Sequence, residues 1–240
     1  MAETPDTNAA VWKSEEGVAH FLATARSQEQ RRAHPRRFLA ELLPFADGDR
    51  FTFVDLGAGT GAAAAAVLER YPAAQAVLAD FSPQMMAEGD KALAPYAGRY
   101  RYVEFDLAHG SWPAGLPDPA DAVISSLCVH HLPDERKQQL IREILARLAP
   151  GGWYLNFEPV SAPDPAVGEA WQRVNDRLDP AAAEKRAHLT PEERRHWENH
   201  VRYLIPLAAQ VEFLRAAGFE AVDVYWKELD YVIYGGRRPR

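Results

Sequence analysis

Short apolar runs alternate with longer amphipathic stretches through the middle of the chain. The apolar runs have the length of buried strands, and they occupy Phe51–Leu56, Gln75–Asp80, Tyr100–Asp106, Asp121–Leu127 and Trp153–Glu158. The stretches between them have helical spacing, most clearly at Ala62–Arg70, Pro83–Leu93 and Asp134–Leu148. Strands that alternate with helices in this way predict a parallel sheet with helices on both faces.

The two flanks of this region are also patterned. Residues Ser14–Leu43 predict a helical cap, and Val167–Ala217 has a helical pattern rich in His, Trp, Arg and Glu, part of which we expect to cover the site as a lid. Thr190, with Glu193 three residues later, has the sequence of a helix-capping box. We expect one domain over residues 1–240, divided into a cap (1–48), a core (49–160), a lid insertion (161–216) and a final β-rich segment (217–240).

The first apolar run ends in a glycine turn. The sequence FTFVDLGAGTG places Gly57, Gly59 and Gly61 between the predicted strand and the next helix. Glycines allow a tight turn and a close ligand, and a helix N-terminus offers N–H groups to an anion. The spacing is GxGxG rather than the GxGxxG of dinucleotide sites, which argues against an NAD-dependent oxidoreductase.

Polar residues follow the other predicted strands. Asp80 ends the second strand about 20 residues after the glycines, where a carboxylate can accept hydrogen bonds from both hydroxyls of a ribose. Asp106 ends the third strand, and the fourth ends in the segment Ser125–His131. Ligands of open α/β sheets bind beyond the carboxyl ends of the strands, so these residues should converge on one crevice.

The motifs VDLGAGTG, DFSPQMM, FDL, SSLCVHHLPDE and LAPGGWYLNFEP together resemble the class I S-adenosylmethionine-dependent methyltransferases, over residues Phe51–Gly236. The resemblance implies a Rossmann-like seven-stranded sheet, mostly parallel with a terminal antiparallel hairpin. It also implies S-adenosylmethionine as cofactor and S-adenosylhomocysteine as product.

Carried over to this chain, the family pattern gives ten cofactor residues. The glycines would pass beneath the methionine part, Asp80 would hold the ribose, Asp106 would accept from the adenine amino group, and Ser125 would lie near the methionine part or the sulfonium. The full set is Asp55, Gly57, Ala58, Gly59, Gly61, Asp80, Phe81, Asp106, Leu107 and Ser125.

Composition narrows the class of methyl acceptor and the cellular compartment that we expect. The chain has 240 residues, 47% of them hydrophobic, and a formal net charge of −7, which argues against extended contact with nucleic acid. The sequence predicts no membrane span and no signal peptide. Cys128, as the single cysteine, excludes an internal disulfide and fits a cytoplasmic protein. We therefore expect a small-molecule acceptor and a monomer or homodimer.

Methyl transfer from a sulfonium is an in-line displacement onto an O, N or S nucleophile, so a base is needed only when the acceptor arrives protonated. His130 and Glu158, at the ends of the fourth and fifth strands, are the candidate catalytic residues. Each also has a structural alternative, a bond to a neighbouring loop. Since neighbouring strand residues face opposite ways, we expect only one of His130 and His131 to face the site.

Candidate substrate residues are His131, Arg194, His200 and Tyr203. His196 and His200 stand four apart on one predicted helix face, but no acidic or cysteine partner with metal-ligand spacing accompanies them, so we expect no metal site.

Two alternatives stay open. The segment RRHWENHV is similar to the RxxLEN segment of carboxy-S-adenosylmethionine synthases, which serve tRNA modification and in which the arginine, here Arg194, binds an extra carboxylate of the cofactor. The second alternative is a cofactor-binding module without catalysis.

Overall fold

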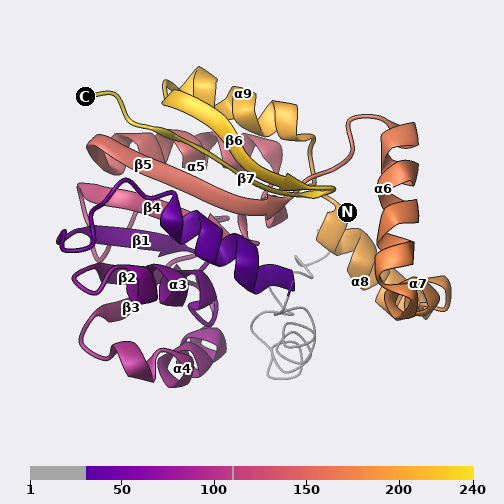
Figure 1. The fold of residues 1–240 in the computed structure, drawn as a ribbon, viewed down its shortest axis with the longest axis horizontal. Helices are drawn as coiled ribbons and strands as arrows, with labels where there is room; N and C mark the ends of the chain where they lie inside the picture. Colours follow the sequence, from indigo (N-terminus) through magenta and orange to yellow (C-terminus); the bar gives the residue numbers. More distant parts are fainter. Residues whose placement is uncertain (1–30, 110) are drawn as a thin grey trace, which may run out of the picture.

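The computed structural model describes residues 31–109 and 111–240, apart from the side chains of Glu192 and His196. A seven-stranded sheet runs through the molecule in the order β3-β2-β1-β4-β5-β7-β6 (Figure 1). The strands are β1 (Thr52–Leu56), β2 (Gln75–Asp80), β3 (Tyr100–Glu104), β4 (Ala120–Ser126), β5 (Leu148–Pro159), β6 (Glu220–Glu228) and β7 (Tyr231–Arg237). The strands β1 to β5 pair in parallel, and β7 pairs antiparallel with both β5 and β6. The expected fold class, with its terminal hairpin, is confirmed.

Helices cover both faces of the sheet, and each face has its own apolar core. One core joins the sheet to α5 (Asp134–Arg147) and α9 (Leu207–Ala217) through residues such as Ile141 and Leu214. The other joins it to α3 (Ala62–Arg70) and to a helix over residues 31–41, through residues such as Leu39 and Val67. The central strands are buried from both sides, which is why they read as continuous apolar runs.

The turns that lead into helices follow their sequence signals. Ser82 accepts a hydrogen bond from the backbone of Met85 at 3.3 Å and caps α4 (Pro83–Ala92), which is followed by the 3₁₀ turn η1 (Ala94–Tyr96). The capping box predicted for Thr190 and Glu193 is present at the start of α8 (Pro191–Val201). Of the predicted cap, residues 14–30 lie outside the described residues, and the helix over 31–41 contains the rest apart from its last two residues.

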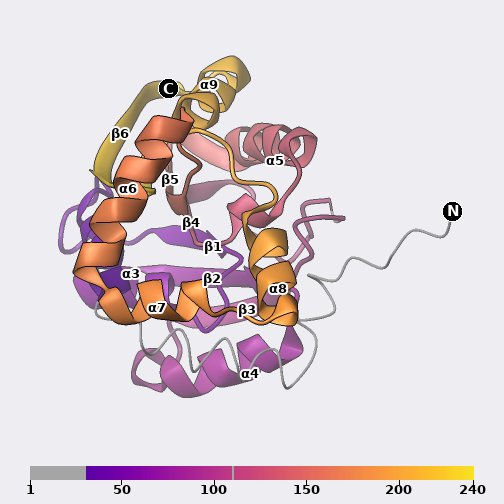
Figure 2. The same cartoon turned by 90° about the vertical axis from the view of Figure 1, so that its right-hand side faces the viewer.

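The predicted lid divides into two parts in space. The helices α6 (Pro165–Leu178), α7 (Pro180–Ala187) and α8 form an arm beyond the carboxyl ends of the parallel strands, with α8 in front of them (Figure 2). In contrast, α9 packs against α5 and the terminal hairpin, and its Gln210 accepts a hydrogen bond from the Tyr234 hydroxyl at 3.0 Å. Assigning 161–216 as one lid was therefore wrong for α9, because its apolar face completes the core.

The segment between α5 and β5 also differs from the prediction. The sequence predicted a helix over Asp134–Leu148 and a strand that begins at Trp153, but strand pairing begins at Leu148, which pairs with Ala120. A register shift follows, and Gly151 takes a left-handed φ of 80°. The glycines thus form an irregularity within one long strand, a common role for glycine in strands. Among the described residues, no helix is long and apolar enough to cross a membrane.

Candidate active site

The glycine turn connects β1 to α3, and all three of its glycines have left-handed backbone angles, with φ of 64°, 55° and 76°. A side chain at Gly57 would also meet Cys128, since an added Cβ would lie 1.9 Å from its Sγ. At Gly61 an added Cβ would lie 2.5 Å from Leu93 Cδ1. The glycines are therefore required by backbone angle and by packing, in addition to the ligand access expected from the sequence.

The turn also suits the cofactor expected from the sequence. Gly61 is the N-cap of α3 and gives no side-chain cap, so the helix N-terminus is available to an anionic group such as a carboxylate. Asp55 is buried beside it, with Oδ2 accepting from the Ala64 N–H at 3.1 Å and Oδ1 without a hydrogen-bond partner among the described residues. A buried acceptor next to a helix N-terminus fits the ammonium and carboxylate of a methionine group.

Asp80 is fixed at the carboxyl end of β2. Its two oxygens accept from the backbone N–H of Gly59 at 2.7 Å and of Ser82 at 2.9 Å. Each carboxylate oxygen can accept a second bond, so this arrangement orients the side chain and leaves capacity for a ribose. The same contact ties the glycine turn to β2.

The other expected cofactor residues lie around the same strand ends. Phe81 is half-buried directly after Asp80, and Ala58 donates its N–H to Ala79 at 3.0 Å. Asp106 accepts from the N–H of Ala108 at 2.9 Å, and the carbonyl of Leu107 accepts from Arg136 at 2.6 Å.

Ser125 is fully buried, and its hydroxyl donates to the carbonyl of Leu56 at 2.9 Å. The hydroxyl therefore links β4 to β1. A contact between Ser125 and the cofactor stays a prediction.

His130 and Glu158 form a buried pair. The His130 Nδ1 lies 2.5 Å from the Glu158 Oε2, and both side chains are almost completely removed from solvent. The other carboxyl oxygen accepts from the N–H groups of Cys128 at 3.0 Å and Val129 at 2.6 Å. Glu158 thus makes the loop bonds proposed as its structural alternative and also holds His130. A catalytic role for the pair stays a prediction.

The pair avoids charge because it is buried. Desolvation raises the pKa of Glu158 to about 8, against the opposing effect of the backbone N–H groups and of Lys137. Desolvation also lowers the pKa of His130 to about 3. Above the pKa of Glu158 its carboxylate accepts from Nδ1–H of the neutral imidazole, and Nε2 carries the free lone pair. Below that pKa the carboxyl O–H donates to Nδ1, and Nε2 carries the proton. Nε2 is buried and has no hydrogen-bond partner among the described residues.

Cys128 stays a thiol for the same reason. Burial raises its pKa well above the usual value, and the nearby carboxylates add to the shift. Its sulfur fills the space beside Gly57. Cys128 is therefore a small packing residue at this position.

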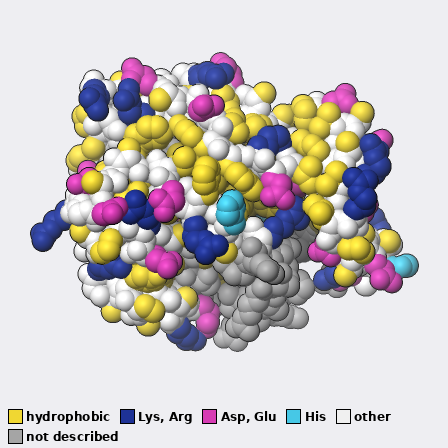
Figure 3. Space-filling model, viewed as in Figure 1, with side chains coloured by type: hydrophobic (Ala, Val, Ile, Leu, Met, Phe, Trp, Pro, Cys, Tyr) yellow, Lys and Arg dark blue, Asp and Glu magenta, His cyan; other side chains and the backbone are white. Residues whose placement is uncertain are grey.

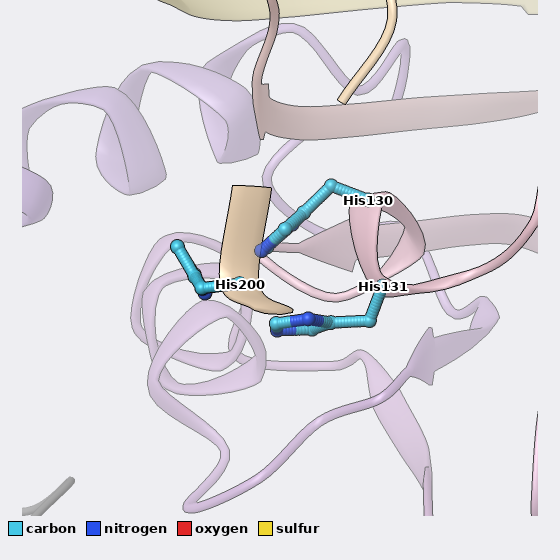
Figure 4. Close-up of side chains that lie close together, drawn as sticks. All are labelled: His130, His131 and His200. Carbon is cyan, nitrogen blue, oxygen red and sulfur yellow. The ribbon is translucent and has the colours of Figure 1, made fainter. Parts of the chain in front are cut away.

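Three histidine side chains, including that of His130, lie close together. His130 and His131 belong to the 3₁₀ turn η2 (Val129–His131), and His200 comes from the last turn of α8; the three rings point toward one another (Figure 4). The ring centroids lie 4.0 Å apart for His130 and His131, and 5.1 Å apart for His131 and His200. The expectation that only one of the two adjacent histidines faces the site was wrong, because β4 ends at Ser126 and strand alternation no longer applies.

The other substrate candidates lie on or after α8. Arg194 is exposed near the start of the helix, and Tyr203 is half-buried just beyond its end. The carbonyl of Tyr203 accepts from Lys137 Nζ, which also contacts Asp134 at 2.9 Å. The sequence analysis did not predict a role for Lys137, a fully buried lysine that connects α5 to the segment after α8.

Comparison with known families agrees with this geometry. The family described as "Methyltransferase domain" matches residues 53–152, which contain the glycine turn, the acidic strand ends and His130. The chain therefore contains a methyltransferase domain, in agreement with the class I S-adenosylmethionine-dependent methyltransferases that its motifs resemble. The cofactor of this family is S-adenosylmethionine.

Individual relatives of this methyltransferase chain are distant. A carboxy-S-adenosyl-L-methionine synthase of Chromohalobacter salexigens is 29% identical over 74% of the chain and 64% of its own length. A trans-aconitate 2-methyltransferase of Azoarcus sp. is 34% identical over 43% of the chain and 37% of its own length. The chain thus spans less than two thirds of either relative.

Among solved structures, an O-methyltransferase family protein from Burkholderia thailandensis superposes with a TM-score of 0.69 at 19% identity, covering 97% of this chain and 62% of that one. At this identity the likeness shows the fold alone.

Proposed function

We propose that this protein transfers the methyl group of S-adenosylmethionine to an O, N or S nucleophile of a small molecule. One observation carries the proposal: the buried His130–Glu158 pair stands beside the glycine turn that the family uses for its cofactor, with Cys128 packed between them. The cofactor supplies an activated methyl group on a sulfonium. The chain's own residues bind, orient and exclude water.

The acceptor would lie against η2 and α8. These two elements are in contact, and they bring His131 and His200 to the same place as His130. A hydroxyl or ammonium acceptor must lose a proton, and Nε2 of His130 can take it when Glu158 is ionised and accepts from Nδ1–H. Glu158 is a positioning residue in this scheme, because it fixes which ring nitrogen carries the proton.

A small-molecule acceptor also fits the charge distribution. On the face shown in Figure 3, basic and acidic side chains are interspersed instead of forming a basic stripe. Together with the net charge of −7, this supports a small acceptor over a nucleic acid.

The proposal is tested in two steps. Isothermal titration with S-adenosylmethionine, and with NAD as the negative control, should show binding of the first alone. Incubation with panels of hydroxyl, amine and thiol acceptors should then release S-adenosylhomocysteine. Absence of binding would overturn the proposal; binding without turnover on any panel would favour the cofactor-binding module.

The relative from Chromohalobacter supports a second candidate, a carboxy-S-adenosylmethionine synthase, because it matches 74% of the chain. Arg194, the residue that would take the extra carboxylate, is exposed on α8, the helix that also carries His200. Mass spectrometry of the small molecules released from the freshly purified protein separates the two candidates. Carboxy-S-adenosylmethionine would favour the second, and unmodified cofactor the first.

A further inference from the structure

The three histidines at the mouth of the site meet the first requirement of a metal centre, convergence of ligand atoms. One ring nitrogen from each of His130, His131 and His200 lies within 4.8 Å of the other two (Figure 4). They come from two elements that are remote in sequence, η2 and α8, so the cluster is a product of the fold. Helical or strand periodicity does not produce it.

The second requirement is a ligand atom of fixed orientation. Metal-binding histidines commonly donate their other ring nitrogen to a carboxylate, which fixes the tautomer and raises the basicity of the ligand nitrogen. His130 has this arrangement, with Nδ1 2.5 Å from Glu158 and Nε2 buried and without a hydrogen-bond partner among the described residues. A buried acceptor left without a partner is destabilising, and a bound cation would satisfy it.

We propose that His130, His131 and His200 form a binding site for one divalent transition-metal ion such as Zn²⁺. Three nitrogen ligands favour Zn²⁺ or its neighbours over Mg²⁺ and Ca²⁺, which prefer oxygen. Three protein ligands leave the fourth tetrahedral position open, as in catalytic zinc sites.

The site needs a small closure to bind the ion. Zn–N bonds of about 2.0–2.1 Å place tetrahedral ligand nitrogens about 3.4 Å apart, so the present spread of up to 4.8 Å must contract by roughly 1.5 Å. His130 is fixed by Glu158, whereas His200 is exposed at the end of α8, so rotation of His200 achieves the contraction at the lowest cost. The buried Lys137 forms an ion pair with Asp134, which offsets the positive charge of the lysine.

The role of the ion rests on the proposed function. An acceptor hydroxyl in the open position would be polarised by the ion, which lowers the pKa of that hydroxyl so that its proton passes to solvent water. Nε2 of His130 then binds the ion and no longer acts as a base. The Glu158 contact that orients Nε2 as a base in the metal-free protein would also orient it toward the metal. The acceptor class that fits is a hydroxyl or carboxylate compound able to bind a metal through oxygen.

Metal binding is tested on the protein alone, without cofactor or acceptor, so that failure of the methyltransferase proposal cannot affect the result. Protein stripped with a chelator and then freed of it is titrated with ZnCl₂ by calorimetry, and with CoCl₂ while its visible absorption is followed. We expect one ion per chain, with the visible bands of a tetrahedral Co²⁺ site. No binding of either ion by the wild-type protein overturns the proposal.

Variants then locate the ion. His200→Ala and His131→Ala should each weaken binding by at least about tenfold, in line with the loss of one of three ligands. His188→Ala, an exposed histidine at the end of α7, is the matched control and should bind as the wild type does. Wild-type affinity in His200→Ala, with its fold verified by circular dichroism, would also overturn the proposal. If the chelator leaves methyl transfer unchanged, the ion has no catalytic role, although the binding site itself stands.

Discussion

The cofactor side and the histidine side of this site are built in different ways. On the cofactor side, Asp55, the glycine turn and Asp80 come from one continuous strand–turn–helix–strand unit, and backbone N–H groups hold both carboxylates. On the histidine side, His130, Glu158 and His200 come from three separate elements that only tertiary packing brings together. The first kind of site is readable as a motif, whereas the second exists only when the chain is folded. It also follows that the two sides should be separable by mutation.

The largest expected effect comes from Glu158→Gln, which breaks the histidine side alone. A glutamine can still accept from Cys128 and Val129, but its amide must donate to Nδ1 of His130, so Nε2 becomes an N–H donor. Nε2 then cannot accept a proton or bind a metal. We expect kcat for methyl transfer to fall by about 10²–10⁴-fold, with unchanged affinity for S-adenosylmethionine.

Steady-state kinetics and cofactor titration measure this prediction. Glu41→Gln is the control, since Glu41 is an exposed carboxylate paired with Arg70 far from the site. Loss of cofactor affinity in Glu158→Gln would show that the two sides are not independent.

Gly57→Ala tests the contact between the two sides, where Gly57 of the cofactor side packs against Cys128. The substitution forces a left-handed φ on alanine and places its Cβ against Cys128. Gly98→Ala is the matched control, because Gly98 has φ of 82° with no atom near its Cβ position. The backbone cost of about 1–2 kcal/mol should appear in both, and overpacking should add about 1–3 kcal/mol in Gly57→Ala.

Urea unfolding measures the difference between the two alanine variants. Adding Cys128→Gly to Gly57→Ala should recover part of the lost free energy of unfolding, because it removes the Sγ and Cβ that the new methyl meets. Equal stability of the two single variants would contradict the clash.

Asp80→Asn breaks the cofactor side alone. An asparagine has one acceptor oxygen, so its amide group must face one of the two N–H donors of Gly59 and Ser82, and the ribose loses a charged partner. We expect affinity for S-adenosylmethionine to fall by about 10–100-fold, corresponding to roughly 1–3 kcal/mol. Asp90→Asn, an exposed change on α4, is the control in calorimetry; binding of Zn²⁺ should stay at the wild-type level.

The most gradual effect is a pH dependence of stability. Burial raises the pKa of Asp55 to about 7, partly offset by the Ala64 N–H and Arg36. Between about pH 4 and pH 7 the folded protein therefore keeps a proton that the unfolded chain has lost, and the free energy of unfolding falls as pH rises through this window. One proton gives a slope of at most about 1.4 kcal/mol per pH unit.

Unfolding of the wild type and of Asp55→Asn in parallel isolates this contribution. From pH 4 to pH 7 the free energy of unfolding of the wild type should fall steadily relative to that of Asp55→Asn. A difference that is constant with pH would mean that Asp55 is ionised throughout.

Most of the core could be predicted because it depends on local pattern. The strand runs, the glycine turn and the capping box at Thr190 each report a local backbone preference, and each is present in the structure. The errors have a common cause in contacts with distant segments. The sequence assigned α9 to the lid because helical spacing does not tell which surface a helix packs on. It placed His130 and His131 on opposite sides because strand alternation was carried beyond Ser126, where β4 ends, into the 3₁₀ turn η2.

The sequence by itself determined the fold and the class of cofactor, because a strand–glycine–helix unit and an acidic strand end are specified by neighbouring residues. Only the tertiary structure decided how the histidines are arranged. Glu158 and His200 reach His130 through the packing of β5 and α8, and the resulting pair and cluster depend on side-chain geometry that no spacing in the chain encodes. Burial then fixes the charge of the pair, since the cost of desolvation depends on the atoms that surround it.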